Sequence, residues 1–92
     1  MANKLIFRKH ALQRMFQRSI GVKDVRSVLL DGKTIITYPD DQPYPSRLML
    51  GWRGARPLHV VAADTEDGET IIVTVYEPDP VLWEPGFERK KP

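Results

Sequence analysis

Residues 9–38 read KHALQRMFQRSIGVKDVRSVLLDGKTIITY, and the spacing of their apolar residues changes along the stretch. From Lys9 to Arg18 the apolar residues recur at spacings of one, three and four, which is the stripe of an amphipathic helix. Ile20-Gly21 breaks this helix, and Gly21 is the expected cap of a second helix that ends at Asp31-Gly32. We expect Gly32 to take the left-handed conformation that commonly ends helices. The stretch therefore predicts two consecutive helices.

The residues on either side of these helices predict strands. Leu5-Ile6-Phe7 is a short apolar run that suits an edge strand. After Gly32 the apolar period becomes two, and four strands are predicted over residues 34–38, 47–53, 56–63 and 70–76. The order β-α-α-β-β-β-β predicts an α+β domain with both helices on one face of an antiparallel sheet, because sequential strands usually pair as neighbours.

Length and composition limit the class of protein. Ninety-two residues make a single domain, 1–92, and the prolines after Tyr76 indicate an irregular tail over about residues 78–92. We expect Leu82, Trp83 and Phe87 to pin this tail to the body. The absence of cysteine excludes a disulfide framework. No apolar run approaches the roughly 20 residues that cross a bilayer, and the N-terminus lacks a signal-peptide pattern, so we expect a cytoplasmic protein without a membrane partner.

The charges are distributed unevenly along the chain. The formal net charge is +2, but residues 1–33 carry eight basic and two acidic side chains, a net charge of +6. Residues 34–92 carry six basic and ten acidic side chains, a net charge of −4. The basic segment suits a polyanion such as nucleic acid. The alternative is that the two segments neutralise each other in the folded protein.

Alternation within the strands gives each strand one apolar face. We expect three apolar sets to cover the helices, namely Leu48, Leu50 and Trp52, then Leu58, Val60 and Ala62, and then Ile71, Val73 and Val75. The opposite sets form a mixed face with Arg47, Arg53, His59, Thr74 and Tyr76. Arginine binds phosphate and tyrosine stacks on unpaired bases, so this face suits RNA. The alternative is the ordinary solvated face of an antiparallel sheet.

Several segments together resemble one known family. They are Phe7-x-x-His10-Ala11-x-x-Arg14-Met15-x-x-Arg18-x-Ile20, Val22-x-Asp24-Val25-x-x-Val28-Leu29-x-x-Gly32, Tyr38-Pro39, Pro57-Leu58-His59-Val60-Val61 and Ile72-Val73-Thr74-Val75-Tyr76-Glu77-Pro78. In this combination the sequence resembles a bacterial domain-of-unknown-function family that is placed in the RelE/MqsR-like toxin superfamily. The similarity extends over nearly the whole chain.

The resemblance implies a RelE-like fold and a toxin-like protein of a toxin–antitoxin system. The implied activity is that of an endoribonuclease of the mRNA interferase type that needs no metal or other cofactor, or that of a degenerate relative. The implied partners are RNA, in some relatives on the ribosome, and a cognate antitoxin, which in this family is often a small zinc-finger protein. The alternative function is a non-catalytic RNA- or protein-binding module, and a more remote one is a regulatory domain without a nucleic-acid role.

His10, Arg14 and Tyr76 are the catalytic candidates. His10 and Arg14 lie one helical turn apart, and histidine titrates near neutral pH, which suits proton transfer. Tyr76 ends the last strand, from which residues of the toxin superfamily often reach the active site. The structural alternatives are a capping role for His10, an ion pair for Arg14 and packing against the tail for Tyr76.

The RNA-binding candidates are Arg18, Arg47, Arg53 and His59. Arg18 also suits the C-terminal end of a helix for stability alone, and His59 also suits a hydrogen-bonded position within the sheet. A metal site is not expected. The carboxylate pair Asp40-Asp41 has no partner ligands at a recognisable spacing, and the two histidines lack a third ligand.

Overall fold

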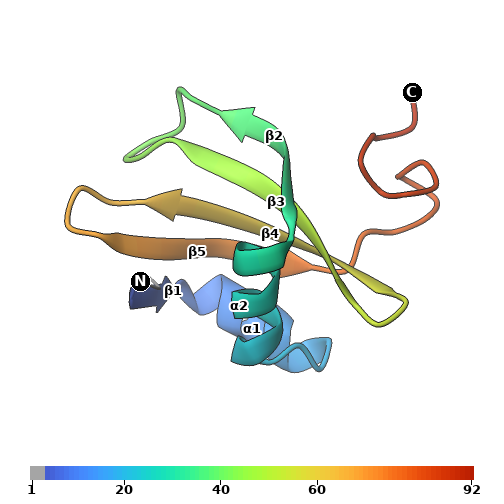
Figure 1. Ribbon diagram of the computed structural model, residues 1–92, viewed down its shortest axis with the longest axis horizontal. Helices are drawn as coiled ribbons and strands as arrows, with labels where there is room; N and C mark the ends of the chain where they lie inside the picture. The colour runs from blue at the N-terminus through green and yellow to red at the C-terminus, as the bar shows by residue number, and fades with distance from the viewer. Residues whose placement is uncertain (1–3) are drawn as a thin grey trace.

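Two helices lie on one face of a five-stranded sheet in the computed structural model, which describes residues 4–92 (Figure 1). The elements are β1 (Lys4–Phe7), α1 (Lys9–Gln17), α2 (Val22–Asp31), β2 (Lys33–Tyr38), β3 (Ser46–Arg53), β4 (Arg56–Asp64) and β5 (Glu69–Tyr76). The predicted α+β class and element order are confirmed. Residues 1–3, on which part of the signal-peptide expectation rests, lie outside the described range. Neither helix in that range is long and apolar enough to span a bilayer.

The strand order in the sheet is β1-β5-β4-β3-β2. Strands β2 to β5 form the predicted antiparallel meander, and β1 is the predicted edge strand. However, β1 pairs with β5 in parallel, from Lys4 opposite Glu69 to Phe7 opposite Ile72, so the sheet is mixed. The helices carry the chain across one face to the far edge, and four antiparallel strands bring β5 back beside β1 in the same direction.

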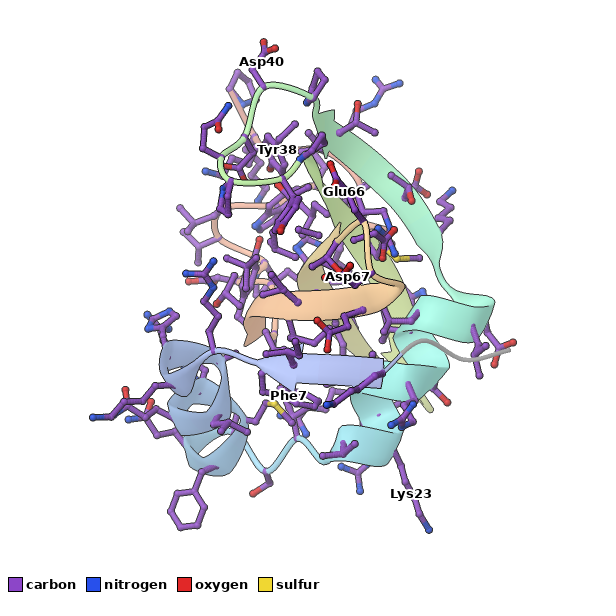
Figure 2. The ribbon with its side chains drawn as sticks, turned by 90° about the vertical axis from the view of Figure 1, so that its left-hand side faces the viewer. Phe7, Lys23, Tyr38, Asp40, Glu66 and Asp67 are labelled. Carbon is purple, nitrogen blue, oxygen red and sulfur yellow. The ribbon has the colours of Figure 1, made fainter. Side chains whose placement is uncertain are left out.

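The main hydrophobic core lies between the helices and the sheet. It contains Ala11, Met15, Ile20, Val25, Val28, Met49, Leu58, Val60, Ala62, Ile72 and Val75. The expected contribution of Leu58, Val60 and Ala62 from β4 is confirmed. Phe7 is partly buried against this cluster and points from β1 to the side of the helices (Figure 2).

The prediction that Leu48, Leu50 and Trp52 cover the helices was wrong. Met49 pairs with Val60 of the core, and Gly51 lies against Val28 of α2, so the alternate residues of β3 face the helices. The predicted face is reversed because the sheet is covered on both faces. The more apolar set buries Leu48 and Leu50 on the face opposite the helices, whereas the helix side carries Met49 and Gly51 between Arg47 and Arg53. Alternation indicates that two sets exist, but it does not say which one meets the helices.

A β-bulge changes the faces of β5. Val61 pairs with Thr74 and Ala62 pairs with Ile72, so Val73 is the extra residue between them. A bulge shifts the alternation by one residue. Ile72 therefore enters the core, whereas Ile71 and Val73 do not, and that part of the prediction was wrong.

The C-terminal tail covers the sheet face opposite the helices, at the right of Figure 1. Trp83 is buried there, and the ring of Phe87 meets Trp52 edge-on with centroids 6.0 Å apart. The expected anchoring by Trp83 and Phe87 is confirmed. Leu82 is 55% exposed, so the expectation that it anchors the tail was wrong.

Two glycines allow α2 to approach β3 closely. Gly32 has a φ of −78°, so the predicted left-handed conformation was wrong. A Cβ atom at Gly32 would instead lie 2.5 Å from the carbonyl oxygens of Val28 and Leu50. At Gly51 a Cβ atom would lie 2.6 Å from Cγ2 of Val28 and 3.0 Å from its Cα atom. Both positions require glycine because a Cβ atom would collide with neighbouring atoms, and not because of a left-handed backbone conformation.

We predict that Gly51→Ala lowers the free energy of unfolding by about 1–3 kcal/mol, because the added methyl group forces α2 away from the sheet. Urea unfolding followed by circular dichroism measures this change. Ser27→Ala, at an exposed position of α2 next to Val28, is the control and stays within about 0.5 kcal/mol of the wild type. Equal stability of Gly51→Ala and the wild type would contradict the proposed close packing.

Candidate functional site

His59 lies at the centre of a buried aromatic cluster on the tail side of the sheet. Its side chain is fully buried. Nε2 lies 2.9 Å from the carbonyl oxygen of Phe87 and Nδ1 lies 3.2 Å from the hydroxyl oxygen of Tyr76. The ring also meets Trp83 and Tyr76 edge-on, at centroid distances of 4.5 and 5.2 Å. We call His59, Tyr76, Trp83 and Phe87 the His59 cluster.

The hydrogen bonds of the His59 cluster assign its protons. A carbonyl oxygen only accepts, so Nε2–H of His59 donates to Phe87, and Nδ1 accepts from the Tyr76 hydroxyl. Burial lowers the pKa of His59, although the hydrogen bond to Phe87 opposes part of this effect. Burial also raises the pKa of Tyr76. Both side chains are therefore neutral near pH 7, and both ring nitrogens of His59 are occupied within the protein.

His10, Arg14 and Arg18 form an exposed stripe along α1, which we call the α1 stripe. At about 100° per residue the three side chains span about 80° of the helix surface, beside the buried stripe of Ala11 and Met15. The first turn of α1 contains no acidic residue. Within residues 4–92, none of the three side chains takes part in an ion pair. The α1 stripe therefore presents its positive charges to solvent.

Arg56 joins the end of α1 to the end of β5. Its guanidinium donates to the carbonyl oxygens of Arg18 and Ser19, and its Nε lies 2.6 Å from Oε1 of Glu77. Glu77 follows Tyr76 in the chain, so the Arg56 guanidinium bridges the backbone of Arg18 and the residue next to Tyr76. The sequence analysis did not single out Arg56. The only sequence feature that could have indicated its role is the opposite charge of Glu77 at the end of a neighbouring strand. That feature indicates an ion pair only once the strand register is known.

The other two predicted arginines lie near opposite ends of β3, on the side of the helices. Nη1 of Arg47 lies 2.8 Å from Oδ2 of Asp64. Nη1 of Arg53 lies 3.1 Å from the carbonyl oxygen of Ser19 and 3.3 Å from Oδ2 of Asp24. The expected mixed face with both arginines and His59 was therefore wrong, because the β3 alternation is reversed.

The structure brings some predicted site residues together and separates others. His10, Arg14 and Arg18 share one stripe, whereas His59 and Tyr76 contact each other beneath the tail on the opposite side of the sheet. The three catalytic candidates thus do not lie on one open face. Among residues 4–92, no three His, Cys, Asp or Glu side chains are grouped in a way that would hold a metal ion.

These features define a small α+β domain with two helices on one face of a mixed sheet, a tail on the other face and an exposed basic helix. The chain belongs to the family described as Domain of unknown function (DUF4258), whose model matches residues 7–77. The matched span includes the α1 stripe, His59 and Tyr76, and it ends before Trp83 and Phe87. Searches of curated proteins and of solved structures give no significant match.

The His59 cluster predicts a pH dependence of stability. The unfolded chain binds a proton at His59 below about pH 6.5, whereas the folded protein binds it only at a lower pH. The unfolded state therefore binds more protons in this window. The stabilisation is complete above pH 6.5 and is lost as the pH falls towards the lowered pKa, with a slope of at most about 1.4 kcal/mol per pH unit.

Urea unfolding between pH 5 and 7.5 measures this slope in the wild type, His59→Gln and His10→Gln. We expect His59→Gln to reduce the slope and His10→Gln, which removes the exposed histidine, to retain it. The same slope in all three proteins would show that the buried ring is not the titrating group.

Proposed function

We propose that this protein is a toxin-like, RNA-directed protein of the RelE/MqsR type, and that the α1 stripe is its RNA contact. The observation that carries the proposal is the exposed row of His10, Arg14 and Arg18, which have no acidic partner in the part of the chain that the structure describes. The resemblance of the sequence to that superfamily suggests the class. A cytoplasmic location and a cognate antitoxin are parts of the same proposal.

The charge arrangement supports a localised phosphate contact. Arg47, Arg53 and Arg56 each bind a carboxylate of the protein, whereas within residues 4–92 Arg14 and Arg18 bind none. Guanidinium groups bind phosphate oxygens in a bidentate manner. From His10 to Arg18 the helix rises by about 12 Å, so the α1 stripe follows a short stretch of single-stranded backbone.

The proposed reaction is a metal-independent transesterification. His10 accepts the proton of a ribose 2′-hydroxyl, whose oxygen forms a bond to the adjacent phosphorus. The bond between phosphorus and the 5′-oxygen breaks, that oxygen takes a proton from water, and protonated His10 returns its proton to the solvent. The products are a 2′,3′-cyclic phosphate and a free 5′-hydroxyl. Arg14 stabilises the negative charge that develops on the phosphate oxygens.

One observation favours a second candidate function, an RNA-binding module that does not cleave. The Tyr76 hydroxyl donates to His59 beneath the tail, and burial raises the pKa of Tyr76. A phenol in this position has no access to a phosphate at α1. In this alternative the α1 stripe binds RNA, and the His59 cluster only holds the tail on the sheet.

We predict that Arg14→Ala and Arg18→Ala each weaken the binding of a fluorescent single-stranded RNA. For each lost phosphate contact, the slope of log affinity against log salt falls by about 0.7. Fluorescence anisotropy at several KCl concentrations measures both quantities. The matched control is Lys33→Ala, which removes the same charge from a lysine that is already paired with Glu88. RNA binding that is unaffected by either arginine variant would overturn the proposal.

Gel analysis of the same RNA in the presence of EDTA separates the two candidate functions. Cleavage by the wild type that is lost in His10→Ala, measured at protein concentrations that saturate the RNA with each variant, supports the toxin-like enzyme. Salt-sensitive binding without cleavage supports the binding module. Growth arrest on expression of the wild type, relieved by His10→Ala, would support the enzyme inside the cell.

A further inference from the structure

The outer side of the two helices carries exposed apolar side chains that do not belong to the α1 stripe. Phe16 is 89% exposed, Leu12 is 48% exposed and Val22 is 44% exposed. Leu12 and Phe16 lie one turn apart on α1, and Val22 begins α2. We call these three residues the helix patch. A phenyl ring that is this exposed gains no stabilisation from burial of its apolar surface unless another molecule covers it.

The helix patch and the α1 stripe lie on opposite flanks of α1. At about 100° per residue, Leu12 and Phe16 lie on one side of the buried Ala11 and Met15, and His10 and Arg14 lie on the other side. The centres of the two flanks are about 180° apart. A ligand on the helix patch therefore contacts side chains different from those of the proposed RNA contact.

A groove runs beside Phe16, where α1 turns into α2. It has a volume of about 660 Å³, and its walls include Met15, Phe16, Ile20 and Val22, with Lys23 at its edge. A capping hydrogen bond holds the first turn of α2 beside this groove, because Gly21 N–H donates to Oδ2 of Asp24 at 2.8 Å. The site is thus a shallow, open depression beside an exposed ring, with apolar walls and charged side chains at Lys23, Asp24 and Arg53.

The charged side chains around the helix patch are mostly basic. Lys9, Lys23 and Arg26 are exposed on the two helices, and within residues 4–92 none of them forms an ion pair. Lys23 projects away from the body of the protein (Figure 2). The one carboxylate at the groove, Asp24, already accepts from Gly21 N–H and Arg53. The surface therefore offers apolar contact and unpaired positive charge.

We propose that the helix patch is a docking site for an acidic amphipathic segment of a partner protein. An apolar side chain of that segment enters the groove beside Phe16 and Val22, and its carboxylates approach Lys9, Lys23 and Arg26. Such segments bind by apolar anchors spaced along one face of a helix, and opposite charges set their orientation. This interaction does not depend on the proposed RNA activity, because it uses the other flank of α1.

Other occupants fit the same surface less well. A second copy docked through the same face would bring two equally basic surfaces together, each with Lys9, Lys23 and Arg26, since the two surfaces of a twofold contact are identical. For a membrane surface, the three exposed apolar side chains Leu12, Phe16 and Val22 are few to insert. RNA bases stack on Phe16, but Leu12 and Val22 present aliphatic groups that offer no stacking surface.

The test uses the whole protein and a fluorescein-labelled synthetic peptide of about 18 residues, with leucines at helical i, i+3, i+4 and i+7 positions and glutamates elsewhere. Fluorescence anisotropy measures its dissociation constant against the wild type, Phe16→Ser, Lys23→Glu and a scrambled peptide of the same composition. We expect each substitution to weaken binding by about tenfold or more, because it removes an anchor or reverses a charge. Both positions are exposed, so the fold is retained, and thermal unfolding checks this.

Two matched controls test whether the loss of peptide affinity is specific to the helix patch. Leu82→Ser removes an apolar side chain that is 55% exposed from the tail, and Lys33→Glu reverses a charge away from the helix patch. Neither should change peptide affinity. Backbone amide shifts in a ¹H–¹⁵N NMR titration should map to residues 9–26, and the RNA affinity of Phe16→Ser should equal that of the wild type.

Three outcomes would overturn the docking proposal. The first is that the helix patch does not bind the peptide, shown either by no binding to the wild type at millimolar concentration or by equal binding to the wild type and Phe16→Ser. The second is self-association in sedimentation that Phe16→Ser abolishes. The third is loss of binding to RNA or to anionic vesicles, without any loss of peptide binding, in Phe16→Ser. Peptide binding with these sensitivities supports docking even if Arg14→Ala leaves RNA binding unchanged.

Discussion

The central strands β3 and β4 are buried on both faces, and the rest of the molecule follows from this constraint. The helices cover one face, and the tail covers the other with Trp83 and Phe87. His59 stays buried between these layers because each ring nitrogen has a partner, one of them the Phe87 carbonyl. The carbonyl comes from a residue with a φ of +60°, a conformation that costs about 1–2 kcal/mol for a side chain other than glycine. The tail is therefore a structural layer of the domain, although it has no helix or strand of its own.

The periodicity of the sequence predicts the elements well and their faces less well. The change from helical to alternating spacing at Gly32 is local, so the helices and strands follow from it directly. Assigning a face requires a difference between the two sides of a strand. In β4, Leu58, Val60 and Ala62 are matched by a less apolar set, and the prediction was confirmed. In β3 both sets meet a covering layer, and the more apolar set with Leu48 and Leu50 is buried on the face opposite α2, so the apolar pattern indicated the wrong side.

The candidate site also has one part that the sequence predicts and another part that it does not. The α1 stripe follows from spacing within one helix, since residues four apart share a flank. The pairing of Arg47 with Asp64, and of Arg56 with Glu77, depends on strand register and on the bulge at Val73. Neither feature has a local signature in this sequence. For the same reason, the sequence predicts only that His59 and Tyr76 share one face of the sheet. The burial of their contact depends on the path of the tail, which the sequence does not determine.

The uneven charge of the chain now has a structural account. Acidic residues pair with cations that lie on the sheet or at its edges, as Asp64 does with Arg47, Glu77 with Arg56 and Glu88 with Lys33. Among residues 4–92, the ion pairs of Lys4 with Glu69, Lys33 with Glu88 and Arg53 with Asp24 join the two segments of opposite charge, so the segments neutralise each other only in part. Cations on the outer side of the helices keep their charge exposed because α1 contains no acidic residue. A net charge of +2 thus coexists with a strongly basic helical surface. On that surface the buried stripe of α1 separates two flanks of different chemistry, one with histidine and arginine and the other with leucine and phenylalanine. A single short helix can therefore serve two ligands without their competing for the same side chains.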